Sequence, residues 1–333
     1  MSEKKYVASL PNEGVEDGRK CEKKPKVHKD KPEITVTEYK VEVLIQNATS
    51  GIGEGPHWDS KTQSLLYVDI YNYDVHRWDA LTGQNTKYHF NEPVTLVIPN
   101  KNGGYIVSVG KKIVLLNWET GNYTVLAEVE KNIDGNRFND GKCDPEGRLW
   151  AGTMSYPDWY KGSLYRMDLD GSIHKLLTNI SISNGLAWTK DGKTMYYIDS
   201  KPKKIYAFDY DNKKGIITNQ KELVDINSIN ITDPNKQPDG MTIDTEDKIW
   251  VAIHGDGKVI RFDPKTGAPI TTVHFPTRKT TSCTFGGKNL DELYVTSAGK
   301  ASLSDPYAGA VFKVTGLGVR GNQAFVYHGK LNI

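Results

Sequence analysis

Four short segments of this chain place an oxygen-bearing side chain directly before a glycine. Each precedes a strand-like stretch, and the four are Glu54-Gly55, Asp140-Gly141, Asn184-Gly185 and Asp239-Gly240. Glycine permits a tight turn or a close backbone approach at such a position. Asp-Gly and Asn-Gly are also common turn dipeptides, so one copy alone indicates no more than a turn. Four copies in a matching phase favour a shared cation site.

These oxygen ligands come from distant parts of the sequence, so the fold must bring them together. Carboxylates held a few ångström apart repel one another, and a bound cation relieves that repulsion. Carboxylate and amide oxygens suit Ca²⁺, Mg²⁺ and Mn²⁺, and Zn²⁺ is a further candidate. The predicted cofactor is therefore one divalent cation, with its identity left open among these four.

A second kind of polar group stands directly before Asp140. We expect Arg137 to hold a polar or anionic substrate oxygen and Asn139 to hydrogen-bond a hydroxyl group. On spacing alone, an ion pair between Arg137 and Asp134 is an equally good interpretation. The histidines show no metal-ligand spacing, although His57 lies close enough in sequence to Glu54 to be a candidate for contact with substrate.

The elements that would position these residues form an internal repeat. An aromatic residue followed by small or β-branched residues recurs at Tyr67, Tyr105, Trp150, Tyr197, Trp250 and Tyr294. The intervals are 38, 45, 47, 53 and 44 residues. A second strand pattern follows each copy, and many of these strands end in turn residues such as Thr82-Gly83 and Thr266-Gly267. Six units of four strands each predict an all-β fold, a six-bladed β-propeller.

A propeller buries its sheets against one another and closes its ring by joining the chain ends. We expect residues 35–39 or 40–44 to supply the closing strand, with partners in residues 309–314 and 324–327. In such a ring Glu54, Asp140, Asn184 and Asp239 would open blades one, three, four and five. The predicted domains are a disordered, charged extension over residues 1–33 and the propeller over residues 34–333.

Composition narrows the class of protein. The 333 residues carry a net charge of +2, of which residues 1–31 contribute +3, so the remainder is close to neutral. A near-neutral body argues against a nucleic-acid partner, and no apolar stretch reaches the roughly 18 to 20 residues that a membrane span needs. No signal peptide is recognised. The three cysteines have no zinc-type spacing and indicate a reducing compartment. We expect a cytoplasmic protein, by default a monomer.

Several longer motifs resemble those of the regucalcin, senescence-marker and gluconolactonase family, which includes insect luciferin-regenerating proteins. The resemblance runs from about Ile52 to Gly321. It is dense in Asn136-Arg137-Phe138-Asn139-Asp140-Gly141-Lys142, Ser183-Asn184-Gly185-Leu186, Tyr196-Tyr197-Ile198-Asp199-Ser200, Pro238-Asp239-Gly240-Met241, Phe285-Gly286-Gly287-Lys288-Asn289 and Thr315-Gly316-Leu317-Gly318-Val319. Family members are six-bladed propellers, in agreement with the repeat.

The resemblance implies a site and a reaction. It implies that Glu54, Asn184 and Asp239 ligate the divalent ion, with Asp140 a neighbour and not a ligand of first choice. It also implies that Arg137 and Asn139 bind substrate and that the reaction is hydrolysis of a sugar lactone. Asp239, as a ligand and nearby base, is then the candidate catalytic residue that accepts a proton from water.

Two departures bear on specificity. The segment after Met154, Ser155-Tyr156-Pro157-Asp158-Trp159-Tyr160, is shorter than the acidic lid of vertebrate regucalcins. The stretch Gly55-Pro56-His57-Trp58 resembles the insect luciferin-regenerating branch more closely. Three hypotheses stay open: a metal-dependent lactonase or related esterase, including one that acts on a non-sugar substrate; a calcium-binding regulatory protein without turnover; and a propeller platform for protein partners.

Overall fold

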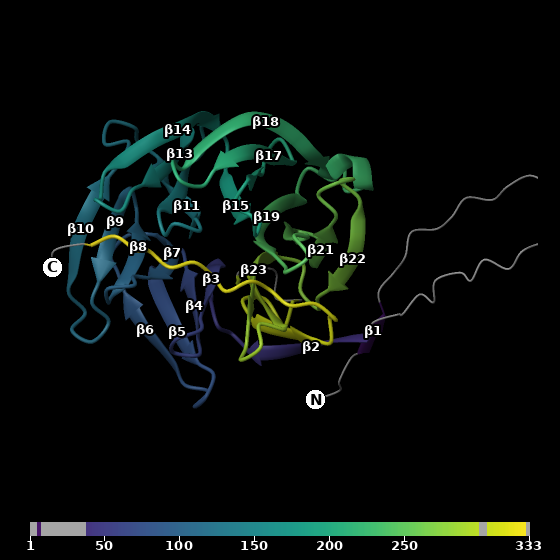
Figure 1. The fold of residues 1–333 in the computed structure, drawn as a ribbon. Coiled ribbons are helices and arrows are strands. Elements are labelled where there is room, and N and C mark those ends of the chain that lie inside the picture. The colour runs from purple at the N-terminus through teal and green to yellow at the C-terminus, as the bar shows by residue number, and fades with distance from the viewer. Residues whose placement is uncertain (1–4, 8–37, 300–304, 331–333) are drawn as a thin grey trace, which may run out of the picture.

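The computed structural model describes residues 5–7, 38–299 and 305–330. They form 25 β-strands and one short 3-10 helix, arranged in six antiparallel sheets around a central axis (Figure 1). The predicted all-β six-bladed β-propeller is confirmed. Of the predicted N-terminal extension, the structure describes only β1 (Lys5–Val7), which pairs with β2. The other residues of that prediction, and the boundary at residue 33, lie outside the described residues.

Each blade has four principal strands, numbered outward from the axis. Blade 1 is β3 (Gly53–Asp59), β4 (Ser64–Asp69), β5 (Asp74–Asp79) and β6 (Asn85–His89). Blade 2 is β7 (Val94–Pro99), β8 (Tyr105–Val109), β9 (Lys112–Leu116) and β10 (Tyr123–Glu128). Blade 3 is β11 (Asn136–Cys143), β12 (Leu149–Ser155), β13 (Gly162–Met167) and β14 (Ile173–Ile180).

The remaining blades follow the same order. Blade 4 is β15 (Ser183–Trp188), β16 (Thr194–Asp199), β17 (Lys204–Asp211) and β18 (Ile216–Asp225), followed by the 3-10 helix η1 (Ile226–Ile229). Blade 5 is β19 (Gln237–Ile243), β20 (Ile249–His254), β21 (Lys258–Phe262) and β22 (Pro269–His274). Blade 6 is β23 (Thr280–Gly286), β24 (Glu292–Ser297), β25 (Val311–Thr315) and β2 (Glu38–Ile45).

The ring closes through β2, which pairs antiparallel with β25. The predicted partnership of residues 40–44 with residues 309–314 is thereby confirmed, with Val41 opposite Val314 and Val43 opposite Phe312. The prediction that residues 324–327 also pair with the closing strand is wrong. Tyr327 instead forms a parallel bridge with Asn100 in blade 2, because the chain leaves blade 6 after β25 and crosses the ring.

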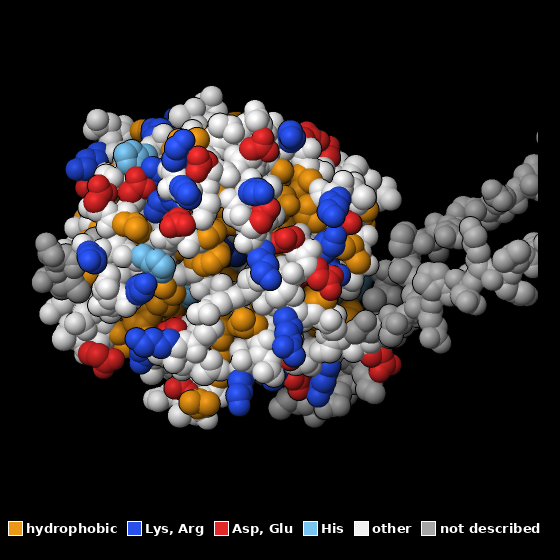
Figure 2. Space-filling model, viewed as in Figure 1, with side chains coloured by type: hydrophobic (Ala, Val, Ile, Leu, Met, Phe, Trp, Pro, Cys, Tyr) orange, Lys and Arg blue, Asp and Glu red, His pale blue; other side chains and the backbone are white. Residues whose placement is uncertain are grey.

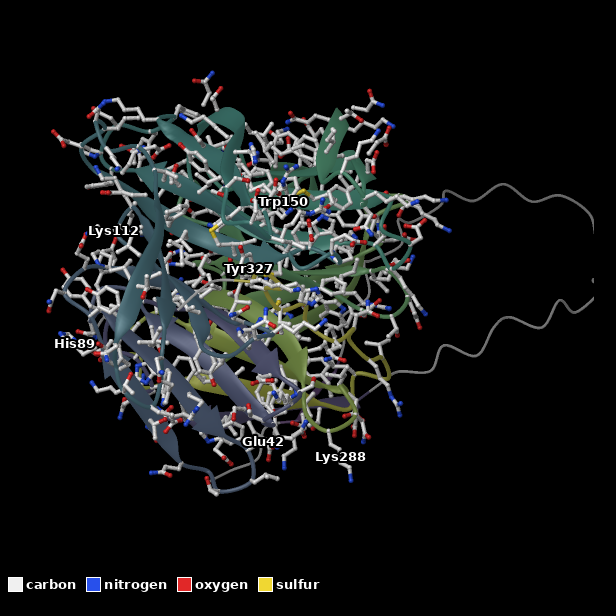
Figure 3. All side chains as sticks on the ribbon, turned by 60° about the vertical axis from the view of Figure 1, so that its left-hand side comes forward. Glu42, His89, Lys112, Trp150, Lys288 and Tyr327 are labelled. Atoms are coloured by element: carbon white, nitrogen blue, oxygen red, sulfur yellow. The ribbon has the colours of Figure 1, made fainter. Side chains whose placement is uncertain are left out.

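The aromatic residues of the repeat lie on the second strand of each blade, and all six are buried. They pack in the wedges between sheets, as when Trp150 meets Trp188 of the next blade edge to face at 5.9 Å between ring centroids. Figure 3 shows Trp150 and Tyr327 inside the molecule, whereas His89, Lys112 and Lys288 lie at its periphery. The repeat is therefore the packing pattern of the propeller.

The C-terminal segment, residues 316–330, crosses one face of the ring (Figure 1, yellow). It starts beside blades 5 and 6, where Thr245 N donates to the Arg320 carbonyl at 2.8 Å, and it ends beside blades 2 and 3, where His328 N donates to the Gly147 carbonyl at 3.0 Å. Figure 2 shows positive and negative side chains interspersed over this same face. Among the described residues, no helix is long and apolar enough to cross a membrane.

Candidate metal centre

All six innermost strands carry a β-bulge at the same point. In each, the register against the second strand shifts so that two residues face one. The bulged pairs are Gly55-Pro56, Thr95-Leu96, Asn139-Asp140, Asn184-Gly185, Asp239-Gly240 and Thr281-Ser282. A bulge bends the strand and turns its side chains. The six-fold repeat therefore directs residues from every blade toward the axis at one level.

Three predicted ligands meet at this level. Asp239 lies within hydrogen-bonding reach of both Glu54 and Asn184, so blades 1, 4 and 5 contribute one side chain each. Burial raises the pKa of Glu54 well above its usual value, and the neighbouring charges of Asp239 and Asp140 raise it further. Burial and Asp140 likewise raise the pKa of Asp239. Without a cation, these carboxylates lie close enough to hinder one another's ionisation.

The amide of Asn184 has a defined orientation. Its Nδ2 donates to the hydroxyl oxygen of Ser200 at 2.8 Å, and that hydroxyl donates to the Pro238 carbonyl at 2.7 Å. The amino group is thereby engaged, and the Asn184 Oδ1 lies 3.4 Å from Asn139 Nδ2. Ser200 was not among the predicted site residues, although it ends the motif Tyr196–Ser200 that carries part of the family resemblance.

Asp140 lies close enough to Glu54 and Asp239 for its charge to act on both. Its Oδ1 accepts the Gly141 N–H at 2.6 Å, whereas its buried Oδ2 has no hydrogen-bond partner. Burial raises the pKa of Asp140, and the ammonium of Lys142 acts against that rise. Lys142 reaches across the channel from blade 3 and donates to the Met241 carbonyl in blade 5.

The donor set fits a hard divalent cation. It combines two carboxylates and an amide oxygen, with a third carboxylate whose Oδ2 lacks a partner, and these are the oxygen donors that Ca²⁺ and Mg²⁺ prefer. Within residues 5–7, 38–299 and 305–330, no three His, Cys, Asp or Glu side chains are grouped to hold a metal ion. The candidate set therefore depends on the Asn184 amide as its third donor.

Arg137 and Asn139 lie beside this centre and are tied to each other. The Arg137 guanidinium donates to Asn139 Oδ1 at 2.7 Å, and Asn139 Nδ2 donates to the Ser183 carbonyl at 2.8 Å. Arg137 also lies over the ring of Tyr71 at 5.6 Å, with its Nη2 3.4 Å from the Tyr71 hydroxyl. These contacts replace the predicted alternative of an ion pair with Asp134.

Tyr71 and the segment 155–160 form an aromatic rim on this face. Tyr71 follows β4, and the segment 155–160 follows the end of β12. Because the pairing is antiparallel, these strand ends lie beside the beginnings of β3 and β11, the first strands of the same blades. Trp159 packs edge to face on Tyr156, and the Lys201 ammonium lies 4.3 Å from the Trp159 ring centroid. Tyr71 is 52% exposed and Tyr156 is 69% exposed. Sequence reasoning missed Tyr71, which no motif marks.

A cavity of about 320 Å³ lies farther along the channel, toward the C-terminal segment. Its lining includes Lys142, His57, Trp188 and Phe325. His57 is buried, and burial lowers its pKa to about 4. His57 therefore lines the channel beyond the bulge and faces away from the rim that carries Arg137 and Tyr71.

Comparisons with known proteins agree with this geometry. Residues 52–299 match the family described as the SMP-30/Gluconolactonase/LRE-like region. Regucalcin from Bos taurus is 44% identical over 288 residues, which cover 83% of this chain and 95% of that protein. A luciferin-regenerating enzyme structure has a TM-score of 0.81 at 36% identity and covers 86% of this chain and 99% of that chain.

A structure described as a calcium-binding protein, regucalcin, from Agrobacterium tumefaciens is also similar. It has a TM-score of 0.78 at 28% identity and covers 87% of this chain and 97% of that chain.

Proposed function

The chain belongs to the SMP-30/gluconolactonase/regucalcin family, and from that premise we propose that it is a divalent-metal-dependent hydrolase of lactones. The observation that supports this most directly is the meeting of Glu54, Asn184 and Asp239 from three blades beside Arg137 and Asn139. Three protein oxygens leave open positions on an ion, whereas a high-affinity Ca²⁺ site normally has six to eight oxygen ligands. Open positions favour catalysis over storage of the ion.

In this proposal Glu54, Asn184 and Asp239 hold the cation. When bound, a divalent cation would polarise the lactone carbonyl and lower the pKa of a water molecule. Asp239 accepts the proton that the attacking water loses, since its carboxyl group is partly open to the channel. The proton then passes to the ring oxygen that leaves, so that one water and one lactone give one hydroxy acid.

Arg137 and Asn139 orient the substrate. Asn139 is held by the Ser183 carbonyl, and Arg137 is held by Asn139 and by Tyr71, so both side chains are positioned before substrate arrives. Guanidinium N–H groups suit the hydroxyl and carbonyl oxygens of a lactone and the negative charge that develops on its carbonyl oxygen. Prepositioning reduces the entropy that binding would otherwise cost.

The test is pH-stat hydrolysis of D-glucono-δ-lactone by EDTA-treated protein, with Ca²⁺, Mg²⁺, Mn²⁺ and Zn²⁺ returned one at a time. We expect turnover with at least one ion. We expect Asp239→Ala to lower kcat/KM by at least about a hundredfold, the scale of a lost general base. Asp170→Ala, in an exposed turn of blade 3, is the control. Full activity of Asp239→Ala would show that Asp239 is not catalytic.

The aromatic rim favours a second candidate within the same chemistry, a lactone or ester with an apolar, planar group in place of a polyhydroxylated sugar. Exposed rings at Tyr71 and Tyr156 offer stacking surfaces beside Arg137. A panel that contains gluconolactone, dihydrocoumarin and phenyl acetate separates the two substrate classes. Metal binding without turnover of any of them would favour a calcium-binding role.

A further inference from the structure

Lys142 places a half-buried ammonium group in the central channel. It follows Asp140 by two residues on β11, so both side chains point to the same side of the strand. Its Nζ donates to the Met241 carbonyl of β19. Blades 3 and 5 are not neighbours, so this side chain passes in front of blade 4 and spans the channel.

The charge of Lys142 acts on the candidate centre through space. Burial lowers the pKa of Lys142, whereas Asp140, Cys283 and Glu54 favour its charged form. No hydrogen bond joins Lys142 to Asp140 within the part of the chain that the structure describes, and Asp140 Oδ2 has no partner. The two groups therefore interact as charges held at fixed positions, in surroundings where water screens them little.

The charges of the centre can be counted. When all are ionised, as a bound cation favours, the three carboxylates Glu54, Asp140 and Asp239 and the ammonium of Lys142 together carry a formal charge of −2. One divalent cation neutralises that charge. Without Lys142 the same set would carry −3 and would attract a more highly charged ion.

We propose that Lys142 is a positioning residue that sets the charge of the metal centre: its ammonium offsets Asp140, so that the centre matches one divalent cation. This inference rests on the proposed function, because it assumes that Glu54, Asn184 and Asp239 bind the ion. The repulsion between Lys142 and a bound ion is proportional to the charge of the ion. Lys142 should therefore disfavour a trivalent ion more than a divalent one.

The test compares Ca²⁺ and Tb³⁺ binding to EDTA-treated, full-length protein by isothermal titration calorimetry. We expect Lys142→Met to bind Ca²⁺ at least about tenfold more tightly, the effect on a divalent ion of one unit charge roughly 8 Å away even when screening is close to that of water. Binding of Tb³⁺ should tighten by at least about thirtyfold, since the same repulsion acts on three charges and not two. Asp140→Asn should weaken both ions, and the double variant should lie close to the wild type.

Lys190→Met is the matched control, because Lys190 lies at the exposed mouth of the same cavity. We expect less than about a twofold change there, as screening by solvent predicts. Lys142→Gln serves if Lys142→Met does not fold, which circular dichroism and thermal unfolding reveal.

Two results would overturn the inference about Lys142, and a third would overturn the proposed function. Unchanged or weaker Ca²⁺ binding by both Lys142 variants would exclude an electrostatic role, and so would equal changes for Ca²⁺ and Tb³⁺, which indicate a structural effect. Failure of the wild type to bind any divalent ion would instead overturn the metal centre on which the proposed function depends. The two failures are therefore distinguishable.

Discussion

At the scale of single residues, the orientation of the Asn184 amide is decided by a neighbour that is not itself a candidate metal ligand. Ser200 accepts from Asn184 Nδ2 and donates to the Pro238 carbonyl, one residue before Asp239. One buried hydroxyl therefore links two candidate metal ligands from adjacent blades. Partners of this kind hold metal ligands in the correct orientation.

Ser200→Ala is expected to weaken divalent-cation binding by about tenfold, the lower end of the effect of losing a partner that orients a ligand. Without the hydroxyl, the Asn184 amide is free to present its amino group to the centre. Calorimetric titration of EDTA-treated protein with Ca²⁺ measures the change. Ser200→Thr keeps the hydroxyl and should retain most of the affinity, and Ser172→Ala, in an exposed turn, is the control. An unchanged dissociation constant for Ser200→Ala would contradict this account.

Residues of the site differ in how well the sequence marks them. Glu54, Asn184 and Asp239 each stand before a glycine, as Asp140 does, so the pattern marks four residues and the family resemblance selects three of them. Their strand positions differ by one residue, because Glu54 lies just before its bulge whereas Asn184 and Asp239 begin theirs. Tyr71, Ser200 and Lys142 follow no such pattern. Their positions depend on contacts with other blades, such as the contact of Arg137 in blade 3 with Tyr71 in blade 1, which a local pattern does not encode.

At the scale of elements, the bulged inner strands need glycine because they pass very close to one another. A Cβ atom on Gly185 would lie 2.5 Å from Met241 Cβ, and one on Gly240 would lie 2.3 Å from Ser282 Cβ. The glycines after Glu54, Asn184 and Asp239 therefore permit close approach of the next inner strand. This approach brings Asn184 and Asp239 into contact.

Gly240→Ala is expected to destabilise the protein by about 1–3 kcal/mol, the usual cost of overpacking a buried position. The added methyl group would collide with Ser282 of blade 6 and push blades 5 and 6 apart at the level of Asp239. Unfolding in guanidinium chloride measures the loss. Ser282→Gly in the same chain removes the nearest atoms and should restore part of the stability. If Gly240→Ala were as stable as the wild type, the inner strands of blades 5 and 6 would have moved apart at no cost in free energy, contrary to this account.

At the scale of the whole molecule, the ring is held at two places. Strand β2 completes blade 6, so residues near the beginning and the end of the described chain share one sheet. The C-terminal segment then crosses the face and inserts Tyr327 among apolar side chains of blades 2 and 3, such as Ile98 and Phe138. The Tyr327 hydroxyl donates to the Asp168 carbonyl at 2.6 Å.

Tyr327→Ala is expected to lower the free energy of unfolding by about 3–5 kcal/mol, as for other large aromatic side chains removed from a core. The stability is lost because removal of the ring leaves a cavity in the core and releases the C-terminal segment that Tyr327 anchors. Phe325→Ala, whose side chain is 39% exposed, should cost less than half as much. Denaturant unfolding of both variants gives the comparison. Equal losses would show that the segment, and not the buried ring, determines stability.

The sequence by itself determined the repeat, because each blade uses the same local turn residues and the same buried aromatic position. The matching phase expected of the four glycine motifs is wrong by one residue, since Glu54 lies just before its bulge and Asp140 is the second residue of its own. The sequence leaves two candidates for the closing strand, and pairing with β25 selects the one over residues 40–44. The six blades follow from patterns within about 50 residues. The side chains that would ligate a cation are recognisable for the same reason.

Only the tertiary structure decided how the parts meet. Tyr327 pairs with Asn100 of blade 2 and not with β2, and Lys142 crosses from blade 3 to blade 5. Both contacts join residues far apart in sequence, and their partners depend on the radius and closure of the ring. Ring closure sets these distances through packing between sheets, which no periodicity along the chain specifies.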